Sequence, residues 1–95
     1  MAVLKRKHNW KVTVVGNQRN GWAPVSTGAV VSGVVHAVLF DFEIQSDPGG
    51  YLLVYASSGG ALYGDTWHET LDAVEQAAFE QFGIPRSSWD PGDAP

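Results

Sequence analysis

Two stretches of the chain alternate between hydrophobic and polar residues with a period of two, as half-buried β-strands do. In the first stretch, Trp10, Val12 and Val14 are separated by Lys11 and Thr13. In the second, one face would carry His36, Val38, Phe40, Phe42 and Ile44. The opposite face would carry Ala37, Leu39, Asp41, Glu43 and Gln45. We predict that the phenylalanine face lies in the core and that the face with the two acidic residues is solvated.

Near the C-terminal end, hydrophobic residues recur with the period of a helix instead. They are Trp67, Leu71, Val74, Ala78 and Phe82. Thr66 followed three residues later by Glu69 has the spacing of a capping box, which begins a helix. Gly83 suits the left-handed conformation that ends a helix, and Pro85 prevents continuation. The pattern therefore predicts one helix over about residues 67–82.

Turn-forming residues separate the remaining strands. Residues 46–50 and 57–60 are rich in Gly, Ser, Asp and Pro, which favour turns. The segment 51–56 between them is apolar on both faces, so we expect a central strand there. Residues 61–63 are expected to form a short strand that leads into the helix.

The region before the second alternating stretch is harder to divide. The β-prone run 29–45 is too long for one ordinary strand, and Ser32-Gly33 predicts a break within it. Residues 16–28 are loop-like because Gly, Asn and Pro interrupt them. We expect Trp22 in this loop to fold back onto the core, since a tryptophan carries a large apolar area.

These elements predict an α+β fold. Successive strands joined by short turns favour an antiparallel β-meander of about four strands. The single amphipathic helix would pack against one face of it, giving two layers. We expect one domain over residues 9–89, with a flexible basic arm at residues 1–8 and a disordered tail at residues 90–95.

The composition fits one small globular domain. The chain has 95 residues, of which 44% are hydrophobic and 17% are charged. It contains no cysteine, so its own residues offer neither a disulfide framework nor thiolate chemistry, which suits the cytoplasm. No apolar run approaches the length of a membrane span, and the basic start is not followed by the apolar region of a secretory signal. We therefore expect a cytoplasmic protein without membrane contact.

The net charge of −4 is unevenly distributed. Residues 1–64 carry five basic and three acidic side chains, whereas residues 65–95 carry one basic and seven acidic ones. An acidic body disfavours nucleic acid as the partner, because phosphate contacts need Lys and Arg. We interpret Lys5-Arg6-Lys7 as a solubilising arm. The alternative is a grip on nucleic acid through charge and stacking, with Trp10 nearby. If the chain has a partner, the charge distribution favours a basic protein. The alternative is the mild acidity that is common among small soluble proteins.

The residues that could carry chemistry do not form a convincing constellation. Asp65, His68 and Glu69 would bind a metal or move a proton only if they converged, and adjacent helical residues point about 100° apart. His8 and His36 have no second ligand at a metal-binding spacing. We predict no catalytic residue, no metal site and no cofactor, and hence a non-enzymatic protein. A minimal enzyme centred on His68 is the alternative.

The helix offers an acidic row that a partner would recognise. Asp72, Glu75 and Glu80 line up with Gln76 on the predicted outer surface, and a dense charge row steers association. Asp41 and Glu43 on the strand face are the second candidate surface, and Trp22 is a candidate anchor if it is exposed. The alternative interpretation is that this row is simply the solvated face of a surface helix.

The helix start Gly-Asp-Thr-Trp-His-Glu-Thr-Leu and the ending Phe-Gly-Ile-Pro, followed by Ser-Trp at Trp89, resemble small uncharacterised bacterial proteins. The chain is also similar in size, acidity and layout to toxin-immunity proteins. That resemblance implies an inhibitor that occludes a basic partner, either a toxin or a host enzyme, and it carries over no functional residue. Phage-encoded inhibitors such as anti-CRISPR proteins share these traits. A homodimeric structural or interaction module is the other class of function that we consider.

Overall fold

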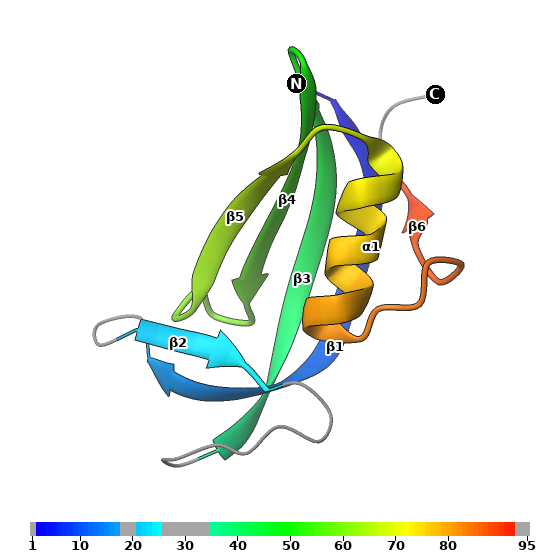
Figure 1. The fold of residues 1–95 in the computed structure, drawn as a ribbon. Helices are drawn as coiled ribbons and strands as arrows, with labels where there is room; N and C mark the ends of the chain where they lie inside the picture. Colours follow the sequence, from blue (N-terminus) through cyan, green and yellow to red (C-terminus); the bar gives the residue numbers. More distant parts are fainter. Residues whose placement is uncertain (1, 18–20, 26–34, 93–95) are drawn as a thin grey trace.

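The computed structural model describes residues 2–17, 21–25 and 35–92, which form six strands and one helix (Figure 1). In chain order the elements are β1 (Val3–Asn17), β2 (Gly21–Pro24), β3 (Val35–Asp47), β4 (Gly50–Ser57), β5 (Tyr63–His68), α1 (Leu71–Phe82) and β6 (Asp90–Pro91). The expected break near residues 32–33 lies outside the described residues. The predicted α+β class with one C-terminal helix is confirmed, but the strands are more numerous than about four.

The strands form one antiparallel sheet in the order β2-β1-β3-β4-β5, curled into a half-barrel. The meander prediction holds for β3, β4 and β5, and β4 is central as expected. It fails at the start of the chain, because β2 pairs with the end of β1 and β3 pairs with the whole length of β1 on the other side. The segment 21–24, expected within a loop, therefore extends the sheet by one strand.

A bulge in β1 changes which side chains face the helix. Lys7 pairs with Phe42, but the next pair along the ladder is Trp10 with Phe40. The strand therefore contains one residue more than its partner there, and Asn9 has a positive φ of 53°. Because side chains alternate along a strand, the extra residue reverses which face each position occupies. Lys5 and Lys7 consequently lie on the same face as Phe42.

The two predicted ends of the domain are ordered parts of the sheet. Residues 3–8, expected to be a flexible arm, belong to β1 and pair with β3. In the expected tail, Asp90 and Pro91 pair with Arg6 and Lys5 as β6. The sequence did not predict a strand over residues 3–8 for two reasons. Its basic residues break the apolar–polar alternation that indicates a strand, and the bulge between Lys7 and Trp10 interrupts the period of two. Residues 93–95 lie outside the described part of the chain.

The helix begins four residues later than the sequence predicted. Thr70 is its N-cap, and the Thr70 hydroxyl accepts a hydrogen bond of 3.0 Å from the backbone N–H of Ala73. Trp67 and His68 lie in β5, where they pair with Leu52 and Tyr51. The capping-box prediction for Thr66 and Glu69 was wrong because pairing with β4, a contact distant in sequence, prevails over a local signal. The predicted end is confirmed, since Gly83 has a φ of 72°.

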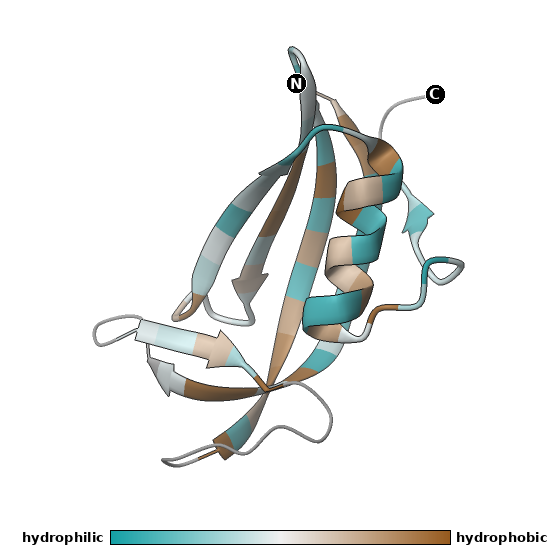
Figure 2. Cartoon of the chain, in the orientation of Figure 1, coloured by the Kyte–Doolittle hydropathy of each residue, from teal (hydrophilic) through white to brown (hydrophobic). Residues whose placement is uncertain are grey.

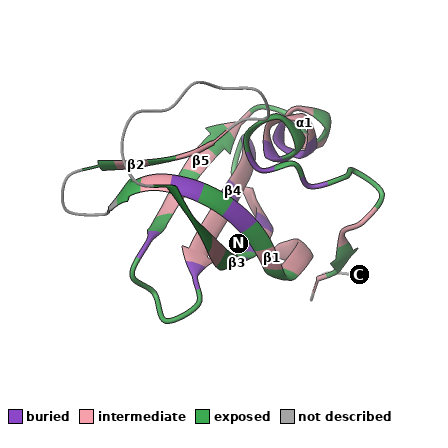
Figure 3. Cartoon of the chain, turned by 90° about the horizontal axis from the view of Figure 1, so that it is seen from below, coloured by how far each residue is buried: buried purple, intermediate pink, exposed green. Residues whose placement is uncertain are grey.

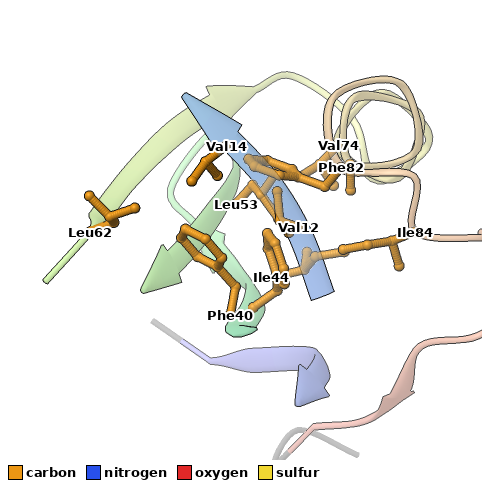
Figure 4. Packing of buried hydrophobic residues seen from close by; sticks show 11 residues of the cluster. Val12, Val14, Phe40, Ile44, Leu53, Leu62, Val74, Phe82 and Ile84 are labelled. Atoms are coloured by element: carbon orange, nitrogen blue, oxygen red, sulfur yellow. The ribbon is translucent and has the colours of Figure 1, made fainter. Parts of the chain in front are cut away.

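The core lies between α1 and the concave face of the sheet. Phe42 and Phe82 have ring centroids 4.8 Å apart, and Tyr55 and Phe82 are 5.0 Å apart. Figure 4 shows buried side chains of the core, among them Phe40, Ile44, Val74 and Phe82, coming together from the strands and the helix. Figure 3 shows the buried residues of α1 on the side that faces the strands. The core comprises Val12, Val14, Phe40, Phe42, Ile44, Leu53, Leu62, Val74, Ala78, Phe82 and Ile84.

We expect Thr70→Ala to lower the free energy of unfolding by about 1 kcal/mol, because the first turn of α1 loses its side-chain acceptor. Thr70→Ser keeps a hydroxyl at the cap and is expected to stay close to the wild type. Urea unfolding followed by tryptophan fluorescence measures both variants. Equal losses for Ala and Ser would show that the cap does not stabilise the helix as described.

Candidate functional site

The acidic row of α1 is largely occupied by contacts within the chain. Glu75 is buried, with a side chain only 10% exposed, and it forms ion pairs with Lys5 of β1 and with Arg86. Arg86 also pairs with Asp72. Glu80 accepts a 3.0 Å hydrogen bond from the amide of Gln76. The centre of the predicted docking row therefore ties β1 and the segment after the helix to α1.

Asp41 and Glu43 lie on the convex face of the sheet, on the side away from α1. Asp41 accepts a 2.9 Å hydrogen bond from the backbone of Asn9, and one of its oxygens lies 3.4 Å from His8. Glu43 pairs with Arg6 at 3.2 Å and accepts a hydrogen bond from Gln45. The structure thus places the two predicted acidic surfaces on opposite sides of the molecule, and one partner surface would not cover both.

Trp22 belongs to the core region and is not an exposed anchor. It is half-buried in β2, and its ring stacks on Phe40 with centroids 5.3 Å apart. The edge of Tyr55 meets the same ring at 5.9 Å. The expectation that Trp22 folds back is confirmed. Its ring closes the concave side of the half-barrel at the β2 end.

The convex face of the sheet carries exposed aromatic and aliphatic side chains. Tyr63, Trp67 and Leu39 are 57%, 50% and 45% exposed. Trp67 lies opposite Leu52 and Tyr63 lies opposite Ala56, so the exposed rings continue into half-buried apolar positions of β4. We call this surface the outer face. It comprises Arg6, Lys11, Leu39, Asp41, Glu43, Leu52, Val54, Ala56, Tyr63, Asp65 and Trp67.

Trp67 is held in place although half of it is exposed. A Cβ atom added to Gly50 would lie 2.5 Å from two atoms of the Trp67 ring, so the ring rests directly on the backbone at that glycine. The pairing of Leu52 with Trp67 supports the ring from the neighbouring position of β4. A large ring that is fixed before binding loses little conformational entropy when a partner covers it.

Sequence reasoning missed this surface because it assigned Trp67 to the helix. A signal for it was present. Tyr63, Asp65 and Trp67 alternate with Gly64, Thr66 and His68, which is the period of a strand. The preceding segment 51–56 was recognised as apolar on both faces, which already required an apolar surface on the side opposite the core.

The structure does not bring Asp65 and His68 together on one face of the sheet. His68 Nε2 lies 2.8 Å from the hydroxyl of Thr66 in the same strand. Asp65 is three positions away along β5 and therefore points to the opposite face of the sheet from His68. Within residues 2–17, 21–25 and 35–92, no group of three potential ligands is arranged to hold a metal ion.

The charge of Asp65 affects the pKa of Tyr55, whose ring packs beside those of Phe42 and Phe82. Burial raises the pKa of the Tyr55 phenol, and the negative charge of Asp65 raises it further. The phenol is therefore neutral near pH 7, as its place beside the rings of Phe42 and Phe82 requires. The carboxylate of Asp65 itself is exposed.

Comparisons with protein-family models, with curated proteins and with solved structures found no match to this chain. The only helix in the described part of the chain has 12 residues, and it is neither long nor apolar enough to cross a membrane.

We expect Glu75→Ala to destabilise the fold by about 3 kcal/mol, because it leaves the partly buried amine of Lys5 without its counter-charge. Glu80→Ala, at an exposed position of the same helix, is expected to change stability by less than about 0.5 kcal/mol. Chemical denaturation compares the two variants. If both behave alike, Glu75 acts as a surface residue and the original acidic row regains its place as a docking candidate.

Proposed function

We propose that this chain is a non-enzymatic protein-binding protein that docks on a basic partner protein through its outer face. The observation that carries the proposal is the exposure of Tyr63, Trp67 and Leu39 on a sheet face that no described element covers (Figure 1). Large rings of this kind are the commonest anchors of protein interfaces. The hydropathy pattern of Figure 2 marks the same alternation along the strands, with apolar and polar positions following one another.

The acidic residues of the outer face support a basic partner. Asp65 lies between the exposed rings of Tyr63 and Trp67, whereas Glu43 on the same face is paired with Arg6, and Lys11 lies opposite Leu39. The chain as a whole carries a net charge of −4. Acidic groups around apolar anchors speed the encounter with a basic surface and select against acidic partners. The row on α1 supplies less of this effect, since Glu75 and Asp72 are already neutralised by Lys5 and Arg86.

Binding of this kind would inhibit by occlusion. A standard interface covers about 800 Å² of each partner, roughly one seventh of the 5706 Å² accessible surface of this chain. An interface of that size on the outer face would cover the active site of a toxin or of a host enzyme. The toxin-immunity and the anti-CRISPR interpretations both remain forms of this proposal, and they differ only in the identity of the partner.

The test is affinity capture from a lysate of the source organism with matched variants of the bait. We expect the double variant Tyr63→Ser and Trp67→Ser to lose at least tenfold of the captured basic protein, because the interface loses its anchors. The control is Phe79→Ser, which removes a ring that is 49% exposed on α1.

Equal capture by the double variant, the control and the wild type would refute the outer face as the binding surface. Sedimentation of the wild type at several concentrations tests the homodimer alternative. A dimer that the double variant abolishes would replace the basic partner by a second copy of the chain.

A further inference from the structure

The edges of the sheet are not equally protected. β2 has only four residues and ends at Pro24, which has no N–H to donate. The outer edge of β1 is paired with β6 at Lys5 and Arg6. β5 is the last strand on the other side, with six residues and no strand beyond it in the described part of the chain. An exposed edge of this length presents main-chain groups to any extended segment that approaches.

The hydrogen bonds next to β5 show which of its main-chain groups point outward. The N–H of Ser57 donates to the carbonyl of Leu62 at 2.7 Å, toward β5, whereas the N–H of Ser58 donates to Leu39 at 2.8 Å, toward β3. Because these directions alternate in an antiparallel ladder, odd-numbered residues of β4 bond to β5. Their partners are Gly64, Thr66 and His68. The main-chain groups of Asp65 and Trp67 therefore point away from the sheet.

β5 lacks the lysine and proline residues that commonly block edge pairing. Its sequence, Tyr-Gly-Asp-Thr-Trp-His, contains no lysine, arginine or proline. Its pairing with β4 runs without a bulge from Tyr51 opposite His68 to Ala56 opposite Tyr63. The single charged group of the strand is the carboxylate of Asp65, which lies on the outer face between the exposed rings of Tyr63 and Trp67.

The charges on the outer face indicate what would lie next to Asp65. One row of directly opposed residues crosses the sheet from Arg6 to Glu43, then to Val54, and ends at Asp65. Arg6 neutralises Glu43 at 3.2 Å. No ion pair reaches Asp65 from the described residues, so its charge is unmatched at the open edge of the row.

We propose that β5 accepts an extended strand of the partner protein, with a lysine or arginine opposite Asp65 and apolar residues opposite Tyr63 and Trp67. This inference rests on the proposed function and names the segment through which the partner is held. Main-chain hydrogen bonds to Asp65 and Trp67 supply the pairing, and the alternate side chains supply the selectivity. A second copy of β5 fits less well, because residues 63–68 offer Asp65 no cation.

The experiment uses the full ¹⁵N-labelled chain and two synthetic peptides. The first is acetyl-Thr-Val-Thr-Arg-Thr-Val-Thr-amide, whose valines and arginine share one face of a strand, and the second has Glu in place of Arg. We expect the Arg peptide to slow hydrogen exchange at the amides of Asp65 and Trp67. The Glu peptide is expected to bind about fivefold more weakly, since it places like charges opposite each other.

A charge-reversal variant tests the residue itself. Asp65→Lys is expected to reverse the preference, so that the Glu peptide binds more tightly than the Arg peptide. The control Glu80→Lys makes the same change in net charge at an exposed site on α1 and is expected to keep the preference of the wild type.

Unchanged exchange at Asp65 and Trp67 with both peptides at millimolar concentration would overturn strand addition. The proposed function would still stand in that case if the Tyr63 and Trp67 double variant loses the captured partner. Slower exchange at these two amides on raising the protein concentration, without peptide, would assign the edge to a second copy and also overturn the proposal. Peptide binding that keeps its Arg preference in Asp65→Lys would refute the role of Asp65.

Discussion

The rings of Phe42, Tyr55 and Phe82 hold α1 against the concave face of the sheet, and this packing decides what the rest of the surface can be. The described part of the chain has one helix to cover a sheet with two faces. The helix packs on the concave face. Because the sheet is curled, α1 contacts several strands there. No element of residues 2–17, 21–25 and 35–92 covers the apolar positions on the convex face, from Leu39 to Trp67.

The charges follow from the same packing. Once α1 lies on the concave face, Glu75 is drawn into its edge, and a buried carboxylate requires a counter-charge. The bulge at Asn9 provides it by turning Lys5 toward the helix. Glu75 and Asp72 of the helix row are thereby paired with Lys5 and Arg86, whereas Asp65 lies on the face of the sheet that no described element covers.

The parts of the fold that sequence predicted well are those set by local chemistry. Residue type alone predicts three of these features: the strand alternation over 36–44, the left-handed conformation of Gly83 and the packing of Trp22 against the core. The parts that failed depend on contacts between distant segments. Trp67 has a helical spacing to Leu71, but pairing with Leu52 places it in a strand. For the same reason, the sequence could not predict the burial of Glu75 or the exposure of Trp67, because neither is decided by neighbours in sequence.

The pairing of β6 with β1 brings the two ends of the described chain together. The backbone N–H of Gly92 donates to the carbonyl of Leu4 at 3.0 Å, and both ends lie at the same end of the molecule (Figure 1). A short linker could join two segments that lie so close without disturbing the core. This geometry suits circular permutation and insertion into a loop of another protein. New termini opened at the exposed turn of residues 58–60 would still leave β4 and β5 on either side of the cut. The described chain thus begins and ends in neighbouring segments of the same sheet.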